Sequence, residues 1–81
     1  MSAYTSLAAF LAHWRALKRE NPKGGPEAAR LAEMDGTIAE VLGTDAALLA
    51  KEDPGASDWR HRQRAESKLR RELLARGIVT G

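Results

Sequence analysis

The chain contains 81 residues, of which 43% are apolar and 30% charged, and its net charge is +2. This balance is typical of a folded globular domain and excludes a disordered tail or a membrane segment, while the length leaves room for one small domain over residues 1–81. Fifteen of the apolar residues are alanine, so few large side chains remain for burial. We therefore expect a thin core that a partner subunit is able to complete.

The N-terminal segment predicts a cytoplasmic protein. Its apolar residues come before Arg15, Lys18 and Arg19, which is the wrong order for a secretory signal, and no apolar run approaches the roughly 20 residues of a membrane-spanning helix. The absence of cysteine excludes disulfide bonds and a thiolate nucleophile and fits a reducing compartment. Abundant alanine and arginine with little lysine indicate a bacterial or phage protein from a GC-rich genome.

The first segment, which precedes the turn residues at 21–26, predicts an amphipathic helix. Its large apolar residues recur at three- and four-residue spacing and share one face: Tyr4, Leu7, Phe10, Leu11, Trp14 and Leu17. Ala9, Ala12 and Ala16 lie on the opposite face. This strip either admits a close second helix or lies in solvent, where alanine serves only as a good helix former.

The second segment favours one continuous helix over residues 27–42. Its apolar stripe keeps its phase across Gly36. The alternative is a break near Asp35-Gly36 with a new helix after it, because a capping box begins at Thr37. Gly43 is suited to end the helix. A short extra helix at 45–51, capped by Thr44, would follow.

The third segment predicts a helix over residues 58–76. Ser57 or Asp58 supplies the N-cap, Gly77 stands at the left-handed C-cap position, and Ile78 stands where a Schellman ending places its apolar contact. The predicted fold class is therefore all-α, a compact three-helix bundle with a possible short fourth helix.

The third helix has an expected apolar face made of Trp59, Leu69, Leu73 and Leu74. We expect Trp14 and Trp59 to pack in the core between the first and third helices. Either indole, if it proved exposed, would become the leading candidate for a partner-binding anchor.

Charge divides the chain into three blocks. Residues 1–26 hold four basic side chains and one acidic side chain. Residues 27–57 hold two basic and seven acidic side chains, and residues 58–81 hold seven basic and three acidic side chains. Attraction between an acidic middle helix and two basic neighbours explains part of this pattern as organisation of the bundle itself.

Four cations form a stripe on the third helix opposite its apolar face. They are Arg60, Arg64, Lys68 and Arg71, and His61 flanks them. Such a row is able to follow a phosphate backbone, which makes these residues the candidate nucleic-acid contacts. The alternative is an ordinary solvated helix face.

A second charged set falls at or inside the apolar arc of the same helix. Arg62, Glu66 and Arg70 have four-residue spacings that permit ion pairs along the helix, and with Trp59 they form the candidate protein interface. Burial of these charges requires partners. The expected partners are a second protein chain or acidic residues of the middle segment, for which the candidates are Glu33, Asp35 and Glu40. The alternative is that the aliphatic stems of these side chains pack against the core while the guanidinium groups reach water.

Catalytic and metal-binding patterns are almost absent. His13 and His61 are the only histidines, and they lack the spacings of metal-binding motifs. We therefore expect no cofactor, no metal and no small-molecule substrate. The predicted function is a non-enzymatic helical interaction module, an adaptor or regulator that binds a protein partner or itself. The alternative is a nucleic-acid-binding protein that uses the basic C-terminal helix.

Overall fold

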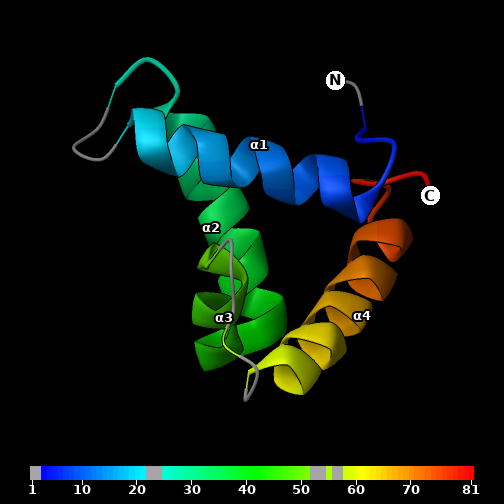
Figure 1. The fold of residues 1–81 in the computed structure, drawn as a ribbon. Coiled ribbons are helices and arrows are strands. Elements are labelled where there is room, and N and C mark those ends of the chain that lie inside the picture. The colour runs from blue at the N-terminus through cyan, green and yellow to red at the C-terminus, as the bar shows by residue number, and fades with distance from the viewer. Residues whose placement is uncertain (1–2, 22–24, 52–54, 56–57) are drawn as a thin grey trace.

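The computed structural model describes residues 3–21, 25–51, 55 and 58–81. Within these ranges the elements are α1 (Leu7–Glu20), α2 (Ala28–Leu42), the short 3-10 turn η1 (Gly43–Asp45), α3 (Ala46–Ala50) and α4 (Trp59–Ala75). The three long helices form the sides of a triangle, and α3 lies beside α2 (Figure 1). The all-α fold class is confirmed, including the short fourth helix between the second and third long ones.

Helix α1 begins and ends with local hydrogen bonds. The Ser6 hydroxyl accepts from the backbone N–H of Ala9 at 3.1 Å, which is a typical N-cap. At the other end the buried Asn21 donates from both its backbone N–H and its side-chain amide to the Leu17 carbonyl. On the alanine face Ala12 is exposed, so this part of the strip lies in solvent.

Helix α2 runs without a break through Gly36, as the phase of its apolar stripe predicts. The Thr37 hydroxyl donates to the Glu33 carbonyl at 3.0 Å within the helix, so it does not cap a new one. Gly43 ends α2 with a φ of 58°, a left-handed conformation that glycine adopts at low cost. The expected Thr44 cap is not formed, because Thr44 lies inside η1 and α3 begins after Asp45.

The core lies between the helices and draws on all of them. α4 packs against both α2 and α3, while α1 packs against α2. The buried apolar residues are Phe10, Leu11, Trp14 and Leu17 of α1, Met34, Ile38, Val41 and Leu42 of α2, Leu49 of α3, Ala65, Leu69 and Leu73 of α4, and Val79. None of the described helices is both long enough and apolar enough to cross a membrane.

The C-terminus of α4 forms the expected Schellman ending. The N–H of Ile78 donates to the Leu73 carbonyl at 2.8 Å and the N–H of Gly77 to the Leu74 carbonyl at 3.1 Å, with Gly77 at a φ of 73°. The chain then pairs with the segment before α1.

Two backbone hydrogen bonds join the ends of the described chain. The Tyr4 N–H donates to the Ile78 carbonyl at 2.8 Å, and the Thr80 N–H donates to the Tyr4 carbonyl at 2.9 Å, which makes a single parallel bridge between Tyr4 and Val79. Figure 1 shows the segment that precedes α1 beside the segment that follows α4. This pairing fixes α4 against the start of α1.

The prediction that Trp59 packs in the core is wrong, because 54% of its surface is exposed. Leu74, also expected on the apolar face, is 37% exposed. The buried arc of α4 is centred on Leu69, and at about 100° per residue Trp59 lies about 80° away from that centre. Trp59 is also the first residue of α4, at the end of the helix where the core stops.

Candidate binding surface on helix α4

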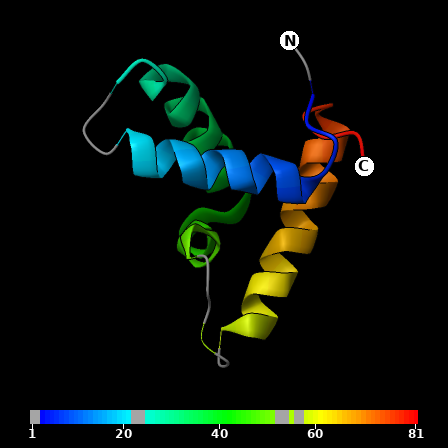
Figure 2. The same cartoon turned by 45° about the horizontal axis from the view of Figure 1, so that its top comes forward.

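The exposed side of α4 carries a row of cations, with a tryptophan at its margin. In both views α4 forms an outer edge of the molecule (Figure 2). One open depression on this side is lined by seven residues, which we call the outward face of α4: Trp59, Arg60, Gln63, Arg64, Ser67, Lys68 and Arg71. All seven are exposed. The four cations predicted as one stripe are therefore brought together, and Trp59 stands beside them.

Helical periodicity explains why these side chains share one side. The buried residues Ala65, Leu69 and Leu73 recur every four residues and face α2 and α3. Arg60, Arg64 and Arg71 are displaced from them by about half a turn and so point to solvent. Gln63 and Ser67 occupy the same arc between the cations, and their position on the helical wheel is the signal that could have identified them from sequence.

Carboxylates are missing from the outward face, and those of the α4 region are engaged elsewhere. The pairs are Asp58 with Lys51 at 3.8 Å, Glu66 with Arg62 at 3.9 Å and Glu72 with Arg76 at 3.7 Å. Among the described residues, no carboxylate lies within ion-pair distance of Arg60, Arg64, Lys68 or Arg71. Their charges therefore add to a local positive potential although the net charge of the chain is small.

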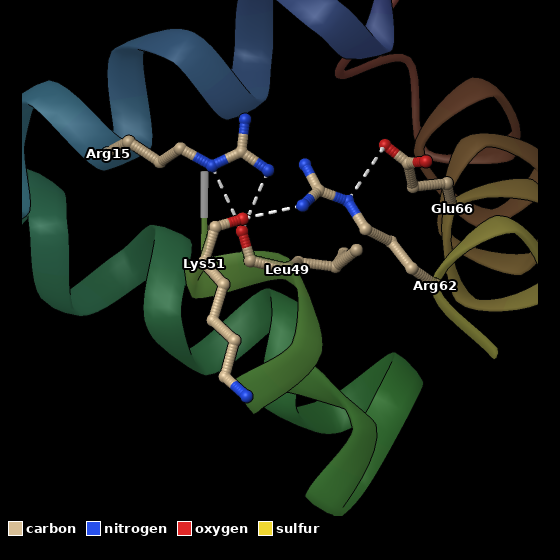
Figure 3. Close-up of polar contacts among 5 residues, drawn as sticks. All are labelled: Arg15, Leu49, Lys51, Arg62 and Glu66. Carbon is tan, nitrogen blue, oxygen red and sulfur yellow. Dashed lines mark hydrogen bonds and ion pairs between the residues drawn. The ribbon is translucent and has the colours of Figure 1, made fainter. Parts of the chain in front are cut away.

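Arg62 lies on the inner side of the same helix and has a different role. Only 13% of its side chain is exposed, and Nη1 donates to the Lys51 carbonyl at 2.6 Å while Nε lies 3.9 Å from Glu66 Oε1 (Figure 3). The expected Arg62–Glu66 pair is present. The other partner is a backbone carbonyl rather than an acidic residue of α2.

A second guanidinium group meets the same end of α3. Arg15 of α1 donates from Nε and Nη2 to the Leu49 carbonyl at 3.0 and 2.8 Å (Figure 3). The last carbonyls of a helix lack intrahelical donors and carry partial negative charge, so Arg15 satisfies an acceptor of α3 at Leu49. Arg62 holds the residue that follows the helix, Lys51. Together Arg15 and Arg62 connect α1, α3 and α4.

The acidic residues expected to pair with Arg62 have other positions. Asp35 accepts from the indole N–H of the buried Trp14 at 2.6 Å and lies 3.6 Å from Lys18 Nζ. Glu40 pairs with Arg76 at 3.3 Å, which raises the pKa of Arg76 above its ordinary value. Glu33 is exposed, as is Arg70 of the candidate protein interface.

His13 takes part in a hydrogen-bond network that the sequence does not reveal. The Tyr4 hydroxyl lies 2.6 Å from His13 Nδ1 and accepts from Arg30 Nη1 at 3.2 Å, and this hydrogen bond raises the pKa of Arg30. Tyr4 and Arg30 line a hollow of about 220 Å³ beside the paired ends of the chain. His61, the second histidine, is exposed.

In the described part of the chain no three potential metal ligands come together. Comparison of the chain with protein-family models, curated proteins and solved structures gives no match.

Proposed function

We propose that this protein is a non-enzymatic helical interaction module that binds a negatively charged macromolecule through the outward face of α4. The observation that carries this proposal is the exposure of Trp59 beside Arg60, Arg64, Lys68 and Arg71, with no described carboxylate in ion-pair distance of the four cations. Tryptophan and arginine are the residues that most often dominate binding energy at interfaces.

The sign of the charge decides what kind of partner is favoured. Two copies of the chain would meet at this face with like charges opposed, which is unfavourable, so self-association through α4 is not supported. An anionic partner would instead be steered to the face and held there by attraction that salt weakens. Arg62 is excluded from the proposed surface because its guanidinium group is engaged by Lys51 and Glu66.

Affinity capture from a lysate of the native host tests this proposal. We expect the immobilised wild-type chain to retain a partner that the Arg60→Gln/Arg64→Gln variant does not retain. The matched control is Lys18→Gln/Arg19→Gln, which removes the same charge from α1. A partner retained equally by the wild type and both variants, or retained by none, would contradict binding through α4.

A further inference from the structure

The arrangement of Trp59 and the cations also carries information about the class of partner. The cations from Arg60 to Arg71 extend along about 16 Å of helix, at 1.5 Å per residue. Neighbouring charges at this spacing lie within one Debye length, about 8 Å at physiological salt. The row therefore acts as a continuous positive strip rather than as isolated charges.

A phosphodiester backbone complements such a strip, because it carries one negative charge per nucleotide in a regular repeat. Gln63 and Ser67 lie between the cations in the same depression and supply neutral hydrogen-bonding groups of the kind that contact phosphates and sugars. Charge alone, however, does not distinguish nucleic acid from an acidic protein.

Trp59 supplies the distinguishing feature. Its indole is 54% exposed and lies at the end of the cationic row. Bases stack on exposed aromatic side chains in proteins that bind single strands, and every base has a face that is able to stack. In a duplex the bases are already stacked on each other, so the indole has no base face to contact.

We infer that the outward face of α4 binds single-stranded nucleic acid, with the phosphates along Arg60, Arg64, Lys68 and Arg71 and one base stacked on Trp59. RNA and DNA share this chemistry, and the experiment below separates them. The inference rests on the proposed function, because it names the partner of the same surface.

Fluorescence anisotropy of the full chain with labelled 12-mers of deoxythymidine and uridine tests the inference, with a 12-base-pair duplex and polyglutamate as competitors. Four phosphate contacts predict that single-strand affinity falls about 50-fold between 50 and 200 mM salt. Duplex and polyglutamate should both compete less well than an unlabelled single strand. The tighter of the two 12-mers identifies the sugar that the surface prefers.

Two variants separate stacking from charge. Trp59→Ala should weaken single-strand binding by about 5- to 150-fold, the range expected for loss of one stacked base, and should leave polyglutamate binding within twofold. Arg60→Gln/Arg64→Gln should reduce the salt slope by about 1.4, whereas Lys18→Gln/Arg19→Gln should not change it. Because Trp59, Arg60 and Arg64 are exposed, the circular dichroism of the α4 variants should equal that of the wild type.

The inference is overturned if duplex or polyglutamate competes as well as the single strand, or if Trp59→Ala binds the single strand as tightly as the wild type. If no nucleic acid binds but capture from the lysate still depends on Arg60 and Arg64, the inference fails and the interaction module stands. If neither binding is observed, both proposals fail.

Discussion

Two glycines of the fold should respond in opposite ways to the same substitution. Gly36 lies inside α2 and Gly77 follows the end of α4 with a φ of 73°. A Cβ added at either position meets no atom within 4 Å. Packing therefore does not contribute at either site, and the difference between the alanine variants is due to backbone conformation.

The magnitudes follow from the two conformations. Gly36→Ala should stabilise the protein by about 0.5–1 kcal/mol, because alanine is the better helix residue. At Gly77 the left-handed conformation costs alanine about 1–2 kcal/mol, which exceeds the roughly 0.4–1 kcal/mol gained by restricting the unfolded chain. Gly77→Ala should therefore destabilise the protein by about 1 kcal/mol.

Urea denaturation followed by circular dichroism measures both free energies of unfolding. In thermal unfolding a change of about 1 kcal/mol corresponds to a Tm shift of about 4–8 °C for a chain of this size, upward for Gly36→Ala and downward for Gly77→Ala. Gly77→Asn is the control, because asparagine tolerates the left-handed region better than alanine. Destabilisation by Gly36→Ala would refute the continuous α2, and stabilisation by Gly77→Ala would refute the Schellman ending.

Three further predictions concern side chains whose polar contacts stabilise the fold. Asp35→Ala should lower the free energy of unfolding by about 1.5–3 kcal/mol, because the indole N–H of Trp14 loses a charged acceptor; no loss in urea denaturation would contradict this. Tyr4→Phe should cost about 1 kcal/mol by removing the hydroxyl at the centre of its network, and an unchanged Tm would show that the network does not stabilise the fold. Arg62→Met keeps the aliphatic stem but removes the guanidinium group from the end of α3, so hydrogen exchange in residues 46–50 should become about fivefold faster. The control Arg64→Met, on the outward face, should leave this exchange unchanged, and equal rates in both variants would contradict a role of Arg62 in holding α3.

Local rules were sufficient for most of the helical architecture. The three- and four-residue spacing of Phe10, Trp14 and Leu17 predicted the buried face of α1, and the same period across Gly36 predicted one continuous α2. Gly77 identified the end of α4, because a left-handed C-cap is a property of a few adjacent residues. These features depend on interactions within one helix.

The environment of Trp59 could not be predicted in the same way. A helical wheel gives the direction of a side chain but not whether the core extends to its level of the helix. At the start of α4 the inner position is taken by Arg62, whose guanidinium group reaches the end of α3. The sequence signalled Arg62 as a charge on the apolar face, but a backbone carbonyl acceptor has no sequence signature.

Contacts between distant segments also could not be predicted from the sequence. Arg15 and Leu49 are separated by 34 residues, and the hydrogen bonds between them depend on how α1 and α3 pack. The basic stripe of α4, by contrast, was predictable as a set of residues. What the structure adds is the exposed indole beside it and the engagement of the nearby carboxylates in other pairs.

Collisional quenching of Trp59 fluorescence tests most directly whether the outward face of α4 is both exposed and positively charged. The emission of Trp59 is obtained as the difference between the wild type and Trp59→Phe, which leaves only the buried Trp14. The ratio of iodide to caesium quenching should be larger for this difference emission than for free N-acetyltryptophanamide, because the neighbouring cations attract the anion, and added salt should reduce this excess. Emission typical of a buried indole, or a quenching ratio equal to that of the free indole, would contradict the proposed surface.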